Sequence, residues 1–446
     1  AVALVAAGLS TAMVALTAGA ASVTATLSGD LTYSGTTYAG VNSAFGGSTF
    51  DEPFLDASIP VYLTQASNKS GASAVPTGLP LYDGVGSSAG KKGVENGTFQ
   101  VGFTDVPLGT VTGINHNVNL DTLAGTSPAT TLSSYIQVPI VLGGVAVAYN
   151  FPHSVTKAWP KGQSLILNAT TIAKIYTGGI TKWNDPAIKA LNPKLVKTTI
   201  KKNKAGKVIS RHTTSLLPNL AITPVYRADG SGTSFAFESY LNQAAPSVFA
   251  GNAAITATTA WPGTSWPSGL VGSDAIGAQK SAGVAYDVSQ TSGGIGYMES
   301  AYVSQNGLGE AKIVNKAGHA EADDAATVSA DALSFTLPSE NANGVVSNFD
   351  IANGTAANAY PISTYSWAVV PSDFKQIALS SDTGGSTGGL TGETVVAKFL
   401  DWAVQDKGGQ ELATKEGYVP LPGPVSLLGE QQIATLTFGG ATLALS

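Results

Sequence analysis

Two patterns of apolar residues alternate along this chain. Short, nearly continuous apolar runs predict buried strands over 137–149, 220–226, 294–298 and 367–370. Segments in which apolar residues recur every three to four positions predict helices over 171–176, 185–191, 233–241 and 393–405. Strands that alternate with helices, in a chain without a visible internal repeat, predict an α/β fold.

Four stretches interrupt this alternation and are polar or rich in Gly, Ser and Thr: 63–79, 111–134, 193–217 and 380–392. We expect the first three to be insertions or surface loops and the fourth to be a flexible connection. The third overlaps a basic stretch, because nine of the 23 lysines and arginines lie between Lys182 and Arg211. We interpret this basic stretch as a solvated loop.

Composition narrows the class of protein. A length of 446 residues predicts two lobes, each with its own core. Charged residues make up only 12% of the chain, and the net charge is −6. General attraction to nucleic acid or to anionic membranes is therefore not expected, and any anion site must be local. The absence of cysteine excludes disulfides, thiol chemistry and thiolate metal sites.

The first 29 residues carry no charge and contain a small-residue pattern, Ala18-Gly19-Ala20, that fits a signal-peptidase site. We expect residues 1–28 to be a signal peptide or its remnant, which places the protein outside the cytoplasm. A transmembrane anchor is the alternative, although this run is only weakly apolar and lacks basic flanks.

Arg227 is one of only two arginines in the chain and opens the segment Arg-Ala-Asp-Gly-Ser-Gly-Thr-Ser-Phe. We expect a strand before it, a turn at Asp229, and a helix from Thr233. Free N–H groups at a helix start, the hydroxyls of Ser231 and Thr233, and a bidentate cation suit an oxyanion. The same residues also suit an ordinary strand-turn-helix junction with a Ser or Thr cap, and the local pattern leaves both readings open.

Motifs of common enzymes are absent around Arg227. A nucleophile elbow needs glycines two residues before and after its serine, but Asp229 and Thr233 occupy those positions around Ser231. The four histidines show no metal-ligand spacing, and we expect each to be structural or exposed: His116, His153, His212 and His319. We therefore expect neither catalysis nor a cofactor.

The glycine-rich segment 84–89 matches the dinucleotide-binding fingerprint, and Asp105 lies 21 residues after its first glycine. However, Pro80 interrupts the run that precedes the segment, while Gly93 and Gly97 make a poor helix after it. We therefore interpret the segment as a loop and not as a nucleotide site.

Asp105 lies in the apolar segment 101–108, with a proline two residues later. A carboxylate in such a place commonly forms a turn or caps a helix. Near a bound oxyanion it would have a sharper role, because an ionised carboxylate accepts hydrogen bonds but cannot donate them. It would then tolerate a protonated ligand such as hydrogen phosphate and repel fully ionised sulfate.

Nine segments in this order carry a resemblance to a known family: 46–50, 86–90, 102–108, 138–149, 175–186, 227–235, 294–297, 359–365 and 417–422. Together they resemble the PstS-like proteins, the periplasmic phosphate-binding subunits of phosphate ABC importers. The likeness covers most of the chain after about Ser43, and the interval from Ser87 to Asp105 matches the family without a gap. Departures are Ala89, where the family normally has Gly, and Tyr226, where a basic residue commonly precedes the arginine.

The resemblance implies a periplasmic-binding-protein type II fold, with two α/β lobes joined by a two-crossover hinge and phosphate buried between them. It implies a first lobe over 29–147 and 363–430, a second over 148–362, and a tail over 431–446. The crossing strands would lie near 145–151 and 360–364.

The resemblance also implies roles for individual residues. Thr49, Phe50 and Ser87 would donate hydrogen bonds to phosphate, and Asp105 would accept the ligand's proton. Arg227 would make the charged contacts and be held by Asp229. The shell would be closed from the helix start by three more residues: Ser231, Gly232 and Thr233.

The function that the resemblance implies is a non-enzymatic, periplasmic or cell-surface protein that captures inorganic phosphate and delivers it to the permease subunits of an ABC importer. We expect a monomer without nucleic acid partners. A secreted phosphatase-like enzyme and a cell-surface or matrix protein on the same scaffold are the alternatives, and the insertions are the reason for the second.

Overall fold

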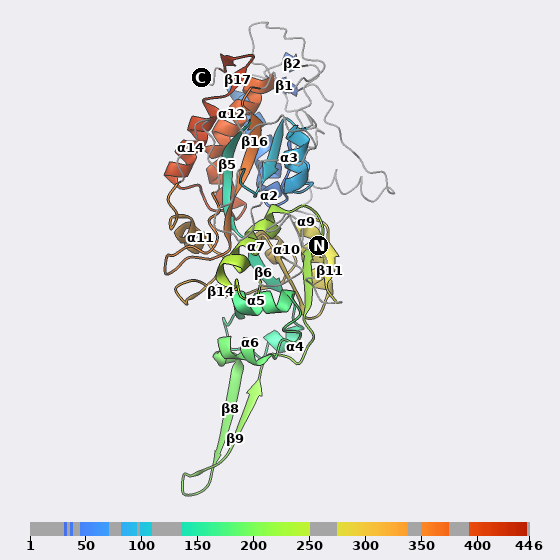
Figure 1. Cartoon of the computed structure of the whole chain (residues 1–446), viewed down its shortest axis with the longest axis vertical. Coiled ribbons are helices and arrows are strands. Elements are labelled where there is room, and N and C mark those ends of the chain that lie inside the picture. The colour runs from blue at the N-terminus through green and yellow to red at the C-terminus, as the bar shows by residue number, and fades with distance from the viewer. Residues whose placement is uncertain are drawn as a thin grey trace.

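The structure is a computed structural model that describes residues 31–33, 36–38, 45–70, 82–95, 99–108, 135–249, 274–337, 349–373 and 392–443. Two α/β lobes lie one above the other along the longest axis of the molecule (Figure 1). A long β-hairpin projects from the far end of the second lobe.

The first lobe is built on a four-stranded sheet with the strand order β3-β4-β16-β5. β3 (Phe45–Gly47) runs parallel to β4 (Val101–Thr104), whereas β16 (Ser363–Pro371) runs antiparallel to β4 and to β5 (Tyr135–Gly144). Every residue of these strands is buried, as expected for a sheet covered on both faces. The helices of this lobe are α2 (Glu52–Ser70), α3 (Ser87–Glu95), α12 (Gly392–Val404), α13 (Gly409–Lys415) and α14 (Gly423–Ile433).

The second lobe has a five-stranded sheet: β11 (Ile276–Ala278), β10 (Thr223–Arg227), β12 (Gly294–Met298), β6 (Ala146–Tyr149) and β13 (Gly309–Glu310). β10 is parallel to both of its neighbours, and β6 is antiparallel to its own. A smaller sheet contains β15 (Ala320–Glu321), β14 (Lys312–Val314) and β7 (Ile166–Asn168). The principal helices are α5 (Ala169–Tyr176), α7 (Gly232–Ala244), α9 (Lys280–Gln290) and α10 (Ser300–Gln305).

Polar caps determine where several helices of the second lobe begin. Asn168 accepts the N–H of Thr171 at 2.9 Å, and Thr171 Oγ1 accepts the N–H of Asn168 at 3.0 Å, which makes a capping box for α5. Asp185 caps α6 (Pro186–Leu191), and Ser231 caps α7. Such caps satisfy N–H groups that a helix start leaves without partners.

The chain crosses between the lobes at two adjacent places. Val145 alone separates β5 of the first sheet from β6 of the second, and the other crossing precedes β16. The N–H of Val145 donates to the carbonyl of Ile362 at 2.7 Å, and the hydroxyl of Tyr360 donates to the carbonyl of Val145 at 2.8 Å. The predicted fold class of two α/β lobes joined by two crossovers is therefore confirmed, whereas the lobe boundaries given above stay predictions.

The elements predicted from periodicity are confirmed. The predicted strands correspond to β5 with β6, β10, β12 and β16, and the predicted helices to α5, α6, α7 and α12. The apolar stripe of α12 is buried, as expected for core packing.

Two expectations about loops in the first lobe are wrong. Residues 63–70 continue α2, and the segment after Gly86 forms helix α3 although it contains Gly90 and Gly93. These glycines allow α3 to pack closely, because a Cβ on Gly90 would lie 2.5 Å from the carbonyl oxygen of Phe103. The helix therefore follows from tertiary packing, which outweighs the low helix propensity of glycine.

The expectation of a loop at 193–217 is also wrong. After a short 3-10 helix (Pro193–Leu195), β8 (Val196–Lys202) pairs antiparallel with β9 (Val208–Ser215). Nearly every residue of the two strands is exposed. The basic stretch from Lys182 to Arg211 is mostly solvated, as predicted, but its part from Val196 onward belongs to a regular hairpin.

The remaining described elements are β1 (Leu31–Tyr33), β2 (Thr36–Tyr38), α4 (His153–Thr156), α11 (Ala325–Ala332), β17 (Thr437–Phe438) and β18 (Ala441–Thr442). Four predicted segments lie wholly or partly outside the described residues: the signal peptide at 1–28, the part 71–79 of the loop expected at 63–79, the loop at 111–134, and all but the last residue of 380–392. Among the helices that the structure describes, none has the length and apolar character needed to span a membrane.

Candidate anion-binding site between the lobes

Three strand ends and three helix starts meet where the two lobes face each other. β3 is followed by Ser48 and Thr49 before α2, β4 is followed by Asp105, and β10 ends at Arg227 shortly before α7. Ser87 begins α3. Ligands of open α/β sheets bind beyond the carboxyl ends of strands, where helix starts present free N–H groups.

Arg227 is the central cation of this cluster and is only 1% exposed. Its Nε donates to Asp229 Oδ1 at 2.7 Å and its Nη2 to Asp229 Oδ2 at 2.5 Å. This fork-to-fork pair fixes the plane of the guanidinium. Burial raises the pKa of Asp229, but the hydrogen bonds and charge of Arg227 outweigh that effect and lower it overall.

The free side of the guanidinium connects the two lobes. Arg227 Nη1 donates to Thr49 Oγ1 of the first lobe at 3.0 Å and to Ser281 Oγ of the second at 3.1 Å. Thr49 and Ser281 also share a hydrogen bond of 3.1 Å. The cation is thus held by Asp229 on one side and presented to hydroxyl groups on the other.

Asp105 is fully buried opposite this cation, in the first lobe. Its Oδ2 accepts hydrogen bonds from Ser48 Oγ at 2.8 Å and from Ser87 Oγ at 3.5 Å, whereas its Oδ1 has no partner. Burial raises the pKa of Asp105 to about 6, against the lowering effects of Ser48 and of the Arg227 charge. A buried carboxyl oxygen without a partner is costly unless a ligand or a proton satisfies it.

The two lobes are in contact at Gly232, the first residue of α7. Its N–H donates to Ser87 Oγ of the first lobe at 3.0 Å. A Cβ at this position would lie 2.5 Å from the Cβ of Asp105 and 2.6 Å from Ser87 Oγ. Only glycine allows this start of α7 to reach the carboxyl of the opposite lobe in the closed arrangement.

Glu299, which follows β12, adds a second buried carboxyl to the site. Its Oε1 accepts hydrogen bonds from Thr233 Oγ1 at 3.2 Å and from Ser281 Oγ at 3.1 Å, and its Oε2 has no partner. Burial raises the pKa of Glu299 to about 7, although Arg227 lowers it. Because Thr233 and Ser281 donate to Glu299, their lone pairs remain available to other donors.

A third buried carboxyl, Asp51, supports the Ser48–Asp51 turn from behind. It accepts hydrogen bonds from Ser366 Oγ at 2.8 Å and from the hydroxyl of Tyr82 at 3.2 Å. The same hydroxyl lies 2.6 Å from the carbonyl of Ser48. Burial and the charge of Asp105 raise the pKa of Asp51 well above its usual range. Asp51 therefore positions the loop that carries Ser48 and Thr49.

The balance of charge shows what the cluster can bind. Asp229 neutralises Arg227 locally, and Asp105 and Glu299 add carboxyl groups with raised pKa values. A fully ionised anion would meet carboxylate repulsion here, whereas an anion that carries a proton can donate it to a carboxylate. The geometry therefore suits a protonated tetrahedral oxyanion better than a strong, permanently ionised one.

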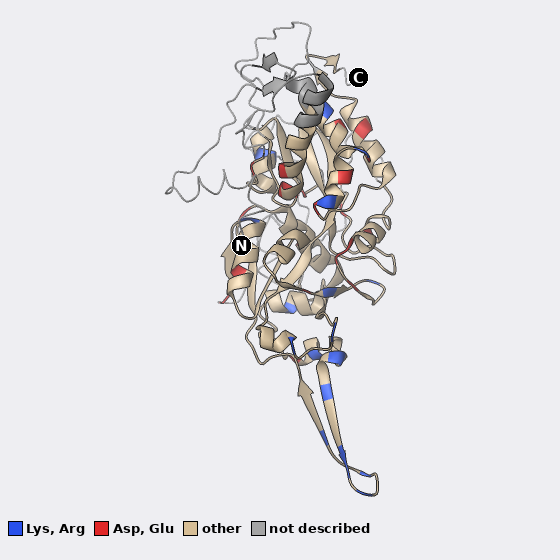
Figure 2. Ribbon diagram, turned by 180° about the vertical axis from the view of Figure 1, so that it is seen from behind, with Lys and Arg blue, Asp and Glu red and all other residues tan. Residues whose placement is uncertain are grey.

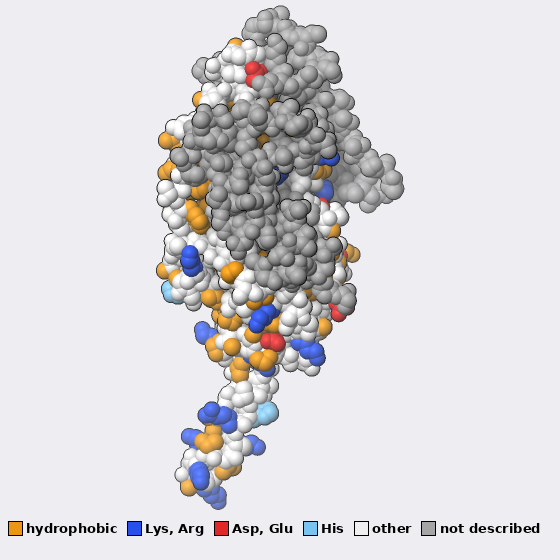
Figure 3. All heavy atoms as spheres, viewed as in Figure 1, with side chains coloured by type: hydrophobic (Ala, Val, Ile, Leu, Met, Phe, Trp, Pro, Cys, Tyr) orange, Lys and Arg blue, Asp and Glu red, His pale blue; other side chains and the backbone are white. Residues whose placement is uncertain are grey.

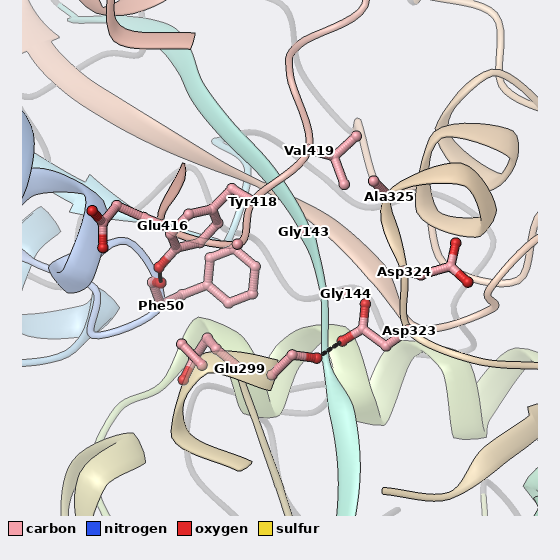
Figure 4. A pocket seen from close by; sticks show the side chains of 13 residues that line it. Phe50, Gly143, Gly144, Glu299, Asp323, Asp324, Ala325, Glu416, Tyr418 and Val419 are labelled. Atoms are coloured by element: carbon pink, nitrogen blue, oxygen red, sulfur yellow. Dashed lines mark hydrogen bonds between the residues drawn. The ribbon is translucent and has the colours of Figure 1, made fainter. Parts of the chain in front are cut away.

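A cavity of about 50 Å³ lies beside this cluster and shares Phe50 and Glu299 with it. Figure 4 shows Asp323, Asp324 and Glu416 around the same space. The cavity is lined by these acidic side chains and by no lysine or arginine. It is therefore unsuited to an anion. The hydroxyl groups around Arg227 and Asp105 identify the candidate site better than the open volume does.

The structure brings the residues named from the sequence into one cluster, and several of them have protein partners there. The N–H of Phe50 donates to Ser48 Oγ at 2.9 Å, and the side chain of Ser231 accepts from the N–H of Ser234 at 3.1 Å. Thr233 Oγ1 donates to Glu299 rather than remaining free. The roles of these residues as phosphate donors stay predictions.

Sequence reasoning did not assign three side chains of the cluster: Ser48, Ser281 and Glu299. Ser48 lies within the family-like segment 46–50, so that segment contained a usable signal. Ser281 and Glu299 belong to no motif that we recognised, and tertiary packing alone places them beside Arg227. In the part of the chain that the structure describes, no group of three or more His, Asp or Glu side chains is arranged to hold a metal ion.

The chain is similar in sequence to known phosphate-binding proteins. The chain is 29% identical to the phosphate-binding protein PstS of Xylella fastidiosa over 346 residues. This alignment covers 76% of this chain and 73% of that protein. It is 27% identical over 383 residues to the PstS protein of Pasteurella multocida, covering 84% and 85%. The resemblance to PstS-like proteins that the sequence suggested is confirmed by these relatives.

Solved structures show the same fold. A periplasmic phosphate-binding protein solved with bound phosphate superposes with a TM-score of 0.57 at 19% identity, covering 91% of this chain and 99% of that one. A phosphate-binding protein from Stenotrophomonas maltophilia gives the same TM-score and identity, covering 90% and 95%. A family profile described as the PBP superfamily domain matches residues 40–407. The chain therefore belongs to the PBP superfamily.

Proposed function

We propose that this protein is an extracytoplasmic binding protein that captures inorganic phosphate between its two lobes and delivers it to an ABC importer. The observation that carries the proposal is that a buried cation, Arg227 fixed by Asp229, and a buried carboxyl, Asp105, lie on the two sides of the lobe boundary. The PstS relatives support it, because Asp105, Arg227 and Asp229 lie in segments that resemble that family.

In the proposed complex, each side chain has a distinct task. The guanidinium of Arg227 binds phosphate oxygens, and the hydroxyls of Thr49 and Ser87 together with helix-start N–H groups bind the others. Asp105 accepts the proton of hydrogen phosphate at its Oδ1, which has no protein partner. Charge-assisted hydrogen bonds of about 1.5–3 kcal/mol each suffice, in small number, for micromolar affinity.

We further propose that permease subunits are the partners, that the protein acts as a monomer in the periplasm or at the cell surface, and that it performs no catalysis. The crossings at Val145 and Ile362 supply the hinge about which the lobes would close.

Titration calorimetry of the phosphate-depleted protein tests the proposal. We expect saturable 1:1 binding of phosphate with micromolar or tighter affinity, and much weaker binding of sulfate. No heat with phosphate at micromolar protein would refute the assignment. Arsenate, which carries a proton in the same way, is the informative third anion and should bind.

A further inference from the structure

The hairpin formed by β8 and β9 is a separate, strongly basic arm. The segment 193–217 holds seven of the 23 lysines and arginines and none of the 29 acidic residues. The rest of the chain, with 16 basic against 29 acidic residues, therefore carries a net charge of −13, while the arm carries +7. Figure 2 shows the cations distributed along the arm and at its tip. A local charge of this size attracts anions although the whole protein is acidic.

The arm is an ordered structure anchored in the lobe. At its base, Leu195 is fully buried and Leu217 is 3% exposed, and the N–H of Leu216 donates to the carbonyl of Leu195 at 2.8 Å. At its tip, Asn203 accepts hydrogen bonds from the N–H groups of Ala205 and Lys207 at 3.0 and 2.9 Å. The cations are therefore held at fixed spacings along a ribbon.

Both faces of the ribbon carry cations. Successive residues of a strand point to opposite faces, and paired residues share a face. Lys197 and Lys201 therefore lie on one face, whereas Arg211, which pairs with Ile200, lies on the other. Lys204 lies in the turn between the strands, and Lys207 follows it. A flat partner would contact only one of these faces, whereas a flexible chain can follow both.

Two features of the arm argue against its pairing with a second copy of the chain and against its insertion into a lipid layer. Lysines along an unpaired strand edge discourage pairing with a strand of a second copy. The exposed Ile200, Val208 and Ile209 near the tip are interspersed with cations instead of forming a continuous apolar patch (Figure 3). These residues therefore do not form the continuous apolar face by which a surface element inserts into a lipid layer.

We propose that the β8–β9 arm is a binding site for a linear polyanion, a polymer that carries phosphate, sulfate or carboxylate groups along its length. Seven strand residues at about 3.3 Å per residue give a ribbon roughly 20 Å long, so that one polymer segment reaches several cations at once. Exposed hydroxyls between the cations, such as Thr199 and Ser210, donate additional hydrogen bonds. This site is separate from the cleft and does not rest on phosphate capture there.

The test measures binding of the full chain to fluorescein-labelled dextran sulfate by anisotropy, with polyglutamate, polyphosphate and neutral dextran as further probes. The arm variant replaces six cations by glutamine: Lys197, Lys201, Lys202, Lys204, Lys207 and Arg211. The matched control replaces six exposed lysines of the body by glutamine: Lys157, Lys161, Lys174, Lys182, Lys316 and Lys407. Both variants change the net charge from −6 to −12, so any difference between them reports the position of the charges.

We expect the wild type and the body control to bind dextran sulfate alike at 50 mM salt, and the arm variant to bind at least tenfold more weakly. The affinity of the wild type should fall steeply and linearly on a log–log plot against salt, because cations bound to a polyanion release its counterions. A second variant that joins Leu195 to Leu216 through a short Gly-Ser link, without the arm, should behave like the arm variant and bind phosphate normally by calorimetry.

Equal losses in the arm variant and the body control would overturn the proposal, as would equal binding of neutral dextran. Binding to anionic phosphatidylglycerol vesicles without binding to any polymer would show that the arm is a lipid-binding element instead. Self-association that is lost in the arm variant, without polymer binding, would show that a second copy is the occupant.

Discussion

The two arginines of this chain lie in opposite electrostatic environments: Arg227 is buried among carboxyl groups, whereas Arg211 is exposed among other cations. Arg227 is 1% exposed and is fixed by Asp229. It lies near two carboxyl groups, Asp105 and Glu299, whose pKa burial raises to about 6 and about 7. Arg211 is exposed on a ribbon that contains no acidic residue. A buried, oriented cation gives selectivity among anions, whereas exposed cations give attraction that salt screens. We therefore expect the single arginine in the cleft to select among anions, and the seven exposed cations of the arm only to attract them.

Removing each arginine in turn should separate the two regions by the largest effect. Arg227→Ala should weaken phosphate binding at least 100-fold, because it removes at least two charge-assisted hydrogen bonds of about 1.5–3 kcal/mol each. Arg211→Ala should leave phosphate binding unchanged. Arg227→Lys, which keeps the charge but not the planar fork, should lie between the two. Calorimetry with phosphate measures all three, and equal effects of the two alanine variants would remove the distinction between the regions.

The closed contact between the lobes is tested by Gly232→Ala. The added Cβ would lie within 2.6 Å of Asp105 and Ser87, so closure is obstructed and we expect phosphate affinity to fall roughly 10- to 100-fold. The matched control is Gly283→Ala in α9, where the nearest atom would be 3.7 Å away, and it should bind phosphate normally. Calorimetry and thermal melts separate the two effects: a large loss of stability with unchanged affinity would argue that position 232 is not at the closing interface.

The smallest predicted change in anion affinity is that of Glu299→Gln. Glu299→Gln keeps the acceptor for Thr233 and Ser281 and removes a negative charge, so phosphate and sulfate should both bind roughly 2- to 10-fold more tightly. Because the pKa of Glu299 is raised to about 7, the carboxyl is charged only above that pH. The gain should be present at pH 8.5 and vanish at pH 5.5. A gain that is independent of pH would show that the charge of Glu299 is not its cause.

The sequence predicted most of the fold because its strongest signals are local. The apolar runs of β5, β12 and β16 and the stripe of α12 are visible without knowledge of their neighbours. α3 was missed because its glycines lower helix propensity, while the packing that favours them involves Phe103, which is distant in sequence. The arm was missed because a polar, exposed hairpin lacks the apolar alternation that identifies a strand.

The residues of the candidate site were likewise predictable only where they lie in a recognisable segment of the sequence. Arg227 and Asp105 lie in segments that resemble a family, and so they could be named from the sequence. Glu299 and Ser281 reach the site through the pairing of β10 with β12 and the packing of α9, which no local pattern reports. The raised pKa values depend on burial, which likewise requires the fold.

The central claim is that Asp105 selects a protonated anion by accepting its proton. Above pH 6 the carboxyl of Asp105 is ionised and can only accept hydrogen bonds, whereas below pH 6 it is protonated and can also donate to sulfate. The preference for phosphate over sulfate should therefore be present above pH 6 and decline as the pH falls through about 6. Asp105→Asn, which carries a donor at every pH, should lose this dependence.

The most direct measurement is the ratio of phosphate to sulfate affinity, obtained by calorimetry at pH 8 for the wild type and for Asp105→Asn. We predict that the substitution weakens phosphate binding, strengthens sulfate binding, and lowers the ratio by roughly 10- to 100-fold, the scale of one charge-assisted hydrogen bond. An unchanged ratio would contradict the account, because Asp105 would then not be the group that recognises the proton.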